Sequence, residues 1–159
     1  MESKQLTPQQ ALQKLKHYCA YQERCHSEVK EKLYNYGLHT TDVEQIISTL
    51  IEENYLDEER FAIHFAGGKF RMKKWGRVKI RYELKQRRVS DYCIKKAIQS
   101  IDEDQYEAAI DKLVEEKLKD AKKYKQPYLK MRFILSALNQ KGYEPDLVRP
   151  VVNKHLSSK

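Results

Sequence analysis

Apolar residues recur every three or four positions along nearly the whole chain, with polar residues between them. One clear example is Val43, Ile46, Ile47 and Leu50. This spacing is typical of amphipathic helices. Thr7 before Pro8 predicts a helix start, and Gly37 predicts a helix end after Leu33. Thr41 and Glu44 have the spacing of a capping box. The pattern therefore predicts an all-α chain.

The same apolar pattern occurs three times. Its first copy is Val29, Leu33, Leu38, Val43, Ile46, Ile47 and Leu50. A shift of 51 positions gives Ile80, Leu84, Val89, Ile94, Ala97, Ile98 and Ile101, and a further shift of 54 gives Ile134, Leu138, Tyr143, Val148, Val151, Val152 and His155. Only His155 breaks the apolar character.

We therefore expect three tandem three-helix repeats, at residues 1–53, 54–101 and 102–159, that together form one continuous repeat domain. The first helix of each repeat is expected around residues 8–21, 57–73 and 102–122. A single repeat buries its apolar faces only against its neighbours. The predicted fold is an elongated, curved array of nine helices.

Three local features conflict with regular helices. Gly67 and Gly68 lie inside the predicted fourth helix, where they predict a kink or a close helix crossing. Arg88 occupies the repeat position of Gly37 and Gly142, so its helix must end without a glycine. Pro150 is expected to break or kink the last helix.

Composition and charge narrow the function. The 159 residues include only 5 glycines and 4 prolines, which disfavours a many-stranded β fold, and 40% are hydrophobic, enough for a core. The formal net charge is +8. Residues 69–96 carry 12 basic and 2 acidic side chains, and residues 121–159 carry 9 and 2. Acidic residues dominate 42–68 and 97–120. A basic surplus of this kind favours nucleic acid or another acidic surface as a partner.

The basic residues near 77–88 form a stripe. At about 100° per residue, Arg77, Arg81, Lys85 and Arg88 lie on one side of the helix, and Ile80 and Leu84 lie on the other. We predict a binding surface made of Arg71, Lys73, Lys74, Arg77, Arg81, Lys85, Arg88 and Lys96. The alternative is a solvated helix face. Trp75, among these cations, is either an anchor between repeats or a platform on which a base stacks.

Motifs for catalysis are absent from the sequence. It contains no phosphate-binding loop, no G-x-G-x-x-G and no nucleophile elbow. Asp57 fits a helix N-cap, with Glu58 and Glu59 complementing the helix dipole, better than an acid–base pair. The three cysteines and five histidines lack metal-ligand spacing. We therefore expect a binding protein, not an enzyme, with no cofactor and no metal.

The sequence also predicts the cellular location and the oligomeric state of the protein. No apolar run approaches the roughly 20 residues of a membrane span, and residues 1–16 lack a signal-peptide core. We expect a cytoplasmic protein that does not bind membranes. No sustained heptad pattern indicates a coiled coil, so we expect a monomer.

Two segments resemble the RecX family of regulatory proteins. The first runs Asn54-Tyr55-Leu56-Asp57-Glu58-Glu59-Arg60-Phe61-Ala62, then Trp75-Gly76, Ile80 and Glu83-Leu84; the second comprises Lys130-Met131-Arg132-Phe133, Leu138, Lys141-Gly142-Tyr143 and Val148. The resemblance covers roughly residues 10–155. It implies three tandem three-helix units in a curved monomer that binds along the groove of the RecA filament on single-stranded DNA. It also implies suppression of strand exchange, ATP hydrolysis and co-protease activity.

Two alternatives remain open at this point. The chain could be a helical module that binds single-stranded or double-stranded DNA directly without RecA. Such a module loses affinity steeply with salt, whereas a filament binder requires RecA for tight association. A helical scaffold whose basic face binds an acidic protein would show no dependence on DNA.

Overall fold

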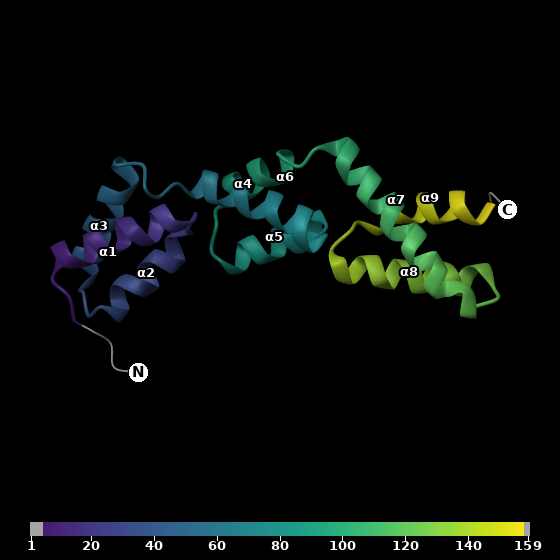
Figure 1. Ribbon diagram of the computed structural model, residues 1–159, viewed down its shortest axis with the longest axis horizontal. Helices are drawn as coiled ribbons and strands as arrows, with labels where there is room; N and C mark the ends of the chain where they lie inside the picture. The colour runs from purple at the N-terminus through teal and green to yellow at the C-terminus, as the bar shows by residue number, and fades with distance from the viewer. Residues whose placement is uncertain (1–4, 158–159) are drawn as a thin grey trace. The chain divides into compact units, whose positions relative to one another are not determined.

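The computed structural model describes residues 5–157, and every regular element in that range is a helix (Figure 1). The α-helices are α1 (Pro8–Tyr21), α2 (His26–Asn35), α3 (Thr40–Glu52), α4 (Glu58–Gly68), α5 (Arg77–Gln86), α6 (Asp91–Gln99), α7 (Glu103–Asp120), α8 (Pro127–Lys141) and α9 (Pro145–Ser157). A π-helical turn, η1 (Lys69–Lys73), follows α4, and a 3₁₀ turn, η2 (Ala121–Lys123), follows α7. The prediction of an all-α chain is confirmed. None of these helices combines the length and apolar character of a bilayer span.

The three-fold repeat is visible in the backbone where the second helix of each repeat ends. Gly37, Arg88 and Gly142 all have left-handed backbone angles, with φ of 82°, 60° and 97°. In each case the next amide donates to the carbonyl five residues earlier: Leu38 to Leu33, Val89 to Leu84, and Tyr143 to Leu138. This is the hydrogen bond of a Schellman cap. Arg88 therefore adopts the glycine conformation, at a cost of about 1–2 kcal/mol.

The first helix of each repeat begins with a side-chain cap. Thr7, Asp57 and Asp102 accept hydrogen bonds from the amides of Gln10, Arg60 and Gln105. The expected starts at Thr7 and Asp57 are confirmed. The capping box expected at Thr41 and Glu44 is wrong, because the N-cap of α3 is His39, two residues earlier, and it makes no side-chain cap bond.

The chain divides into two compact units, Met1–Phe65 with Leu84–Ala97, and Ala66–Glu83 with Ile98–Lys159. The core of the first unit includes Leu15, Val29, Leu33, Val43 and Leu50, all with no exposed surface. In the second unit α7 packs against α8 and α9, with Tyr106 and Ile110 of α7, Leu138 of α8 and Val152 of α9 in its core. The middle repeat contributes to both units. The repeat boundaries at 53 and 101 remain a prediction.

The two irregular features of the sequence have local explanations. α4 ends at Gly68 and η1 begins at the next residue; a Cβ added at Gly68 would meet no atom within 4 Å, so this glycine does not serve a close helix crossing. The break expected at Pro150 is wrong, because α9 continues to Ser157. Proline removes one backbone hydrogen bond, while Val148 and Val152 on either side are buried in the core.

Candidate nucleic-acid interface

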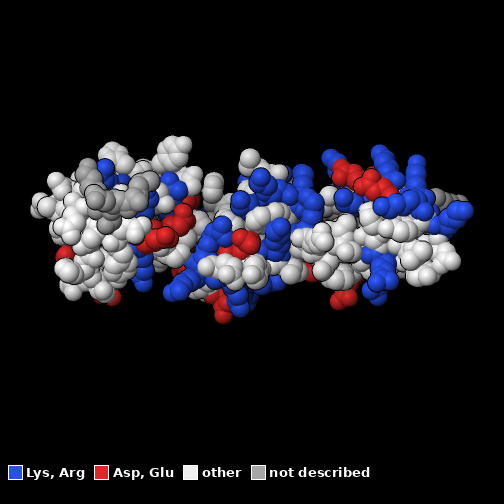
Figure 2. Space-filling model, turned by 90° about the horizontal axis from the view of Figure 1, so that it is seen from below, with Lys and Arg blue, Asp and Glu red and all other residues white. Residues whose placement is uncertain are grey.

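The predicted binding residues fall into both compact units, and each unit has its own set. Arg71, Lys73, Lys74, Arg77 and Arg81 belong to the second unit, and Lys85, Arg88 and Lys96 belong to the first. All of them except Arg77 are exposed. Blue lysine and arginine side chains cover much of the surface where Figure 1 places α5 (Figure 2).

A close backbone crossing fixes the start of α5 in the second unit. The Gly76 amide donates to the Lys141 carbonyl at 2.7 Å, and the Val78 amide donates to the Gly142 carbonyl at 2.9 Å. A Cβ at Gly76 would lie 2.4 Å from the Gly142 oxygen, and a Cβ at Gly142 would lie 2.3 Å from that of Lys79. Only glycine fits at both positions. The crossing thereby places the end of α8 beside the Trp75 turn.

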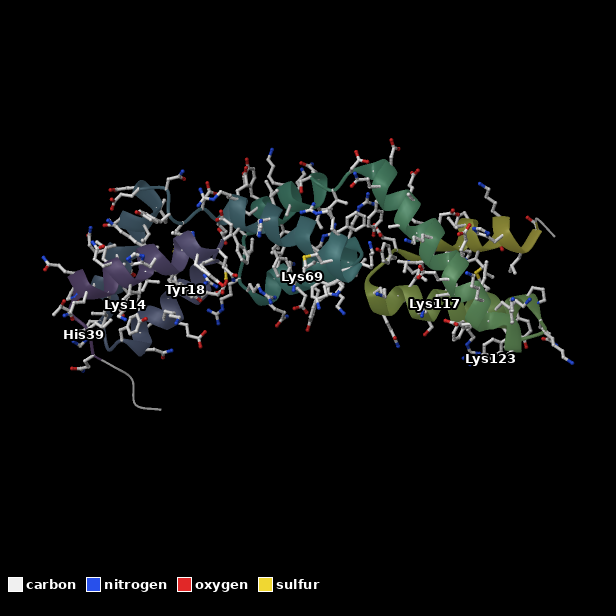
Figure 3. All side chains as sticks on the ribbon, in the orientation of Figure 1. Lys14, Tyr18, His39, Lys69, Lys117 and Lys123 are labelled. Carbon is white, nitrogen blue, oxygen red and sulfur yellow. The ribbon has the colours of Figure 1, made fainter. Side chains whose placement is uncertain are left out.

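Five lysines belong to this turn and its crossing, and we call them the Trp75 lysine cluster: Lys69, Lys73, Lys74, Lys79 and Lys141. The ammonium groups of Lys69 and Lys79 lie 5.0 and 4.7 Å from the centre of the Trp75 ring. Lys141 donates to the Lys73 carbonyl at 3.4 Å, and Tyr143 donates to the Lys74 carbonyl at 3.0 Å. Figure 3 marks Lys69 at the end of α4 where η1 begins.

The cluster holds several positive charges on a surface that the backbone crossing makes rigid. Lys73 and Lys74 are exposed, and Lys69, Lys79 and Lys141 are half-buried. Lys74 has a left-handed φ of 59° and ends η1. The ammonium groups over the indole are cation–π contacts, which hold Trp75 and both lysines together. This arrangement suits recognition of a phosphate backbone.

Arg77 has a different environment from the other predicted residues. Its guanidinium forms ion pairs with Glu103 and with Glu144, the latter at 3.3 Å, and lies 3.8 Å from the centre of the Tyr106 ring. Only 15% of its side chain is exposed. Burial opposes its charge, but the hydrogen bonds and charges of Glu144 and Glu103 outweigh burial and raise the Arg77 pKa above its ordinary value. Arg77 therefore organises the second unit, and its charge is already neutralised.

Tyr106 completes this network. Its hydroxyl accepts from the Arg77 amide at 2.9 Å and donates to Glu144. The ring is fully buried against Phe70 and Tyr143, with centroids 5.8 and 5.2 Å away. Burial, with the Glu144 carboxylate, raises the pKa of Tyr106 far above its usual value.

Arg81 lies in a mixed-charge pocket. The pocket has a volume of about 600 Å³, and its lining includes Arg77, Arg81, Asp102, Glu103 and Glu144. The acidic start of α7 therefore lies beside Arg77 and Arg81 of α5. Net charges counted over consecutive residues do not reveal this proximity. The environment of Arg81 is less favourable to an anion than that of the Trp75 lysine cluster.

In the first unit, the predicted residues are loosely held. Lys85 and Asp91 approach to 3.9 Å, with 61% and 89% of their side chains exposed, so the pair adds little stability. Lys96 lies 5.5 Å from the centre of the Tyr92 ring. Arg88 is exposed at its left-handed position.

One group of side chains has the composition of a metal site. Asp111 and Glu115, four residues apart on α7, and His155 on α9 bring ligand atoms within 4.8 Å of one another. His155 is the polar residue that interrupts the repeat pattern. Its Nε2 lies 3.0 Å from Asp111 Oδ1, a hydrogen bond that accounts for the histidine without a metal.

The binding surface predicted from the sequence omits three members of the Trp75 lysine cluster, namely Lys69, Lys79 and Lys141. Lys69 and Lys79 lie in the basic block, and their position beside Trp75 in the sequence was a usable signal. Lys141 is 66 residues from Trp75, so only the fold brings it near.

Comparison with known proteins identifies relatives. The family model of the second three-helix domain of RecX matches residues 57–98. Regulatory protein RecX of Clostridium tetani is 32% identical over 136 residues, which are 82% of this chain and 60% of the relative. The corresponding protein of Clostridium botulinum strain Eklund 17B is 31% identical over 135 residues, 82% of this chain and 61% of the relative. The chain thus spans about 60% of the length of these relatives.

Solved structures share the fold. The crystal structure of RecX from Lactobacillus salivarius has a TM-score of 0.83 over 92% of this chain and 95% of that one, at 20% identity. A second crystal structure, of a regulatory protein RecX, has a TM-score of 0.81 over 92% of this chain and 71% of that one, at 18% identity. These structures support the helical-repeat fold.

Proposed function

Because the chain belongs to the RecX family, we propose that it is a regulator of the RecA recombinase. In this proposal it binds the RecA filament on single-stranded DNA and inhibits the recombinase, ATPase and co-protease activities of RecA. It acts in the cytoplasm as a monomer and carries out no chemistry of its own. The effect comes from occupying a surface on the filament.

The Trp75 lysine cluster is the observation that supports this proposal most directly. Four of its members, Lys69, Lys73, Lys74 and Lys79, lie in the segment that matches the RecX domain. A nucleoprotein filament presents phosphates and acidic side chains, and clustered lysines attract both. The crossing at Gly76 and Gly142 fixes the backbone that carries these lysines, so little backbone freedom is lost when they bind.

In the second unit, Arg71 flanks the cluster and Arg81 is a secondary contact. Lys85, Arg88 and Lys96 form a separate set of secondary contacts on the first unit. Arg77 contributes by holding α5 against α7 rather than by contacting the filament. A charge reversal at Arg77 therefore tests folding and not binding, so it is excluded from the variants below.

The test is the rate of ATP hydrolysis by RecA on single-stranded DNA, with this chain titrated from sub-stoichiometric amounts to equimolar. We expect a dose-dependent fall. The double variant Lys73→Glu, Lys74→Glu should require far more protein for the same fall. Its matched control is Lys112→Glu, Lys119→Glu, two exposed lysines of α7 in the same compact unit with the same change in net charge.

Two results would count against the proposal. An unchanged rate at equimolar chain, with the chain folded, would show that it does not regulate RecA. Equal loss of inhibition in the test and control variants would show that net charge matters and the Trp75 lysine cluster does not.

A further inference from the structure

We propose that a basic, aromatic pocket formed by α1, α2 and their connection binds one nucleotide of a single-stranded nucleic acid. The pocket lies in the first compact unit, has a volume of about 430 Å³ and is lined by Lys14, His17, Tyr18, Tyr21, Arg24, Lys32 and Tyr36. Figure 3 marks Lys14 and Tyr18 on α1. The inference deepens the proposed function, since the filament forms on single-stranded DNA, but its test needs no RecA.

Cations and aromatic rings make up the whole lining. Lys14, Arg24 and Lys32 carry positive charge, and no lining residue is acidic. The nearby carboxylate of Glu28 is already engaged, because it accepts from the Cys25 amide and thiol at 3.1 Å. An anion entering this pocket therefore meets only favourable charges at its walls.

The guanidinium of Arg24 is positioned before any ligand arrives. Its Nε donates to the Tyr18 carbonyl at 3.0 Å, and its central carbon lies 3.7 Å from the centre of the Tyr18 ring. Lys32 lies 4.8 Å from the same ring centre. A guanidinium held through Nε has two further nitrogens that can donate to a phosphate. The pocket therefore offers a pre-organised phosphate site.

Tyr21 supplies a surface for a base. It is the last residue of α1, and 84% of it is exposed, the highest exposure of any large hydrophobic side chain in residues 5–157. Arg24 and Lys32 already contact the Tyr18 ring, and Tyr36 packs against the core. Tyr21 is therefore the most accessible ring of the lining. Aromatic rings beside a basic groove bind unstacked bases.

The combination favours a single strand over other anions. In a duplex the bases are stacked inside and do not reach a tyrosine at a pocket rim, whereas a single strand offers both phosphate and base face. An acidic peptide would use the cations and leave Tyr21 uncovered. The sequence alone does not indicate this pocket, because residues 1–41 have a net charge of only +2 and the pocket's cations are spread from position 14 to 32.

The experiment is fluorescence anisotropy of a labelled oligothymidylate titrated with this chain alone, from about 50 to 200 mM salt, a range over which phosphate contacts weaken strongly. The variants are Tyr21→Ala, Tyr21→Phe and Lys14→Gln. The controls are Tyr34→Ala, a tyrosine of α2 that is 45% exposed and outside the pocket, and Lys30→Gln, an exposed lysine of the same helix.

We expect Tyr21→Ala to weaken binding roughly 5- to 150-fold, the range that corresponds to loss of one base–aromatic stack. Tyr21→Phe should bind as tightly as the parent chain, since the ring remains. Lys14→Gln should lower the slope of log affinity against log salt by about 0.7, the contribution of one phosphate contact on a single strand. Neither control should change affinity or slope.

Unchanged affinity of Tyr21→Ala for the oligothymidylate would overturn the proposal, as would an equal loss in Tyr34→Ala. Stronger Tyr21-dependent binding of an oligoglutamate peptide or of duplex DNA would overturn it in favour of that ligand. Tyr21-dependent binding together with an unchanged RecA rate would retain the pocket and reject the RecA proposal. Oligothymidylate binding that does not depend on Tyr21, together with a dose-dependent fall in the RecA rate, would reject the pocket and retain the RecA proposal.

Discussion

Replacing Arg77 with alanine removes the charge around which the second unit is organised. The change leaves Glu144 without its cation in a site where only 29% of the carboxylate side chain is exposed. It also uncovers the Tyr106 ring, which is fully buried. Arg81→Ala is the matched control, because Arg81 is exposed on the same helix, four residues later.

The size of the effect follows from the three contacts of Arg77. The hydrogen-bonded pair with Glu144 contributes about 1.5–3 kcal/mol as a charge-assisted bond. The guanidinium over Tyr106 contributes about 0.5–2 kcal/mol. Glu103 is 61% exposed, so its pair adds about 0–1 kcal/mol. We expect Arg77→Ala to lower the free energy of unfolding by about 3 kcal/mol, and Arg81→Ala to change it by less than about 0.5 kcal/mol.

Thermal unfolding followed by circular dichroism measures the difference, and about 3 kcal/mol corresponds to a Tm lower by roughly 6–12 °C in a chain of this length. A double-mutant cycle with Glu144→Gln should give a coupling energy of at least about 1 kcal/mol. A Tm of Arg77→Ala within about 2 °C of the parent chain, or no coupling to Glu144, would refute the structural role assigned to Arg77.

Three further predictions concern the backbone and the buried thiol. Gly76→Ala should lower the free energy of unfolding, measured by urea titration, by at least about 2 kcal/mol, because its Cβ would lie 2.4 Å from a backbone oxygen. Gly68 has open space around it, so Gly68→Ala should leave the free energy of unfolding unchanged or raise it by up to about 1 kcal/mol. Arg88→Gly should raise the Tm, because glycine adopts the left-handed backbone conformation without the strain of about 1 kcal/mol that arginine has there. A lower Tm would contradict this. Burial raises the pKa of Cys19 to about 11, so unfolding releases a proton above pH 9 and stability should fall between pH 9 and 11 by up to about 1.4 kcal/mol per pH unit; an equal fall in Cys19→Ala would contradict this origin.

Features that depend on local spacing were predictable from the sequence. The apolar periods place the first helices at 8–21, 57–73 and 102–122, and the structure has them at Pro8–Tyr21, Glu58–Lys73 including η1, and Glu103–Lys123 including η2. The repeat register also predicted that Arg88 would stand where glycine stands in the other copies. Helix starts, ends and repeats are set by residues a few positions apart, and a sequence displays these directly.

Features that depend on distant partners were not predictable. Arg77 lies in the basic stripe of its helix, but Glu103 and Glu144, which neutralise it, are 26 and 67 residues away. The residues that line the α1–α2 pocket are likewise dispersed along the chain. The acidic residues between them lower the net charge of residues 1–41 to +2, so the sequence does not show a basic cluster there. Helical periodicity shows which face of a helix is polar, but only packing shows which charges on that face remain available.

The most direct test of the regulatory account is the affinity of this chain for single-stranded DNA with and without RecA. A labelled oligonucleotide is titrated with the chain at physiological salt, once bare and once coated with RecA and a nucleotide that keeps the filament assembled. We predict tight association only with the RecA-coated strand, weakened by Lys73→Glu, Lys74→Glu and retained in Lys112→Glu, Lys119→Glu. Equal affinity for bare and coated strands would contradict the account and identify a direct nucleic-acid-binding module.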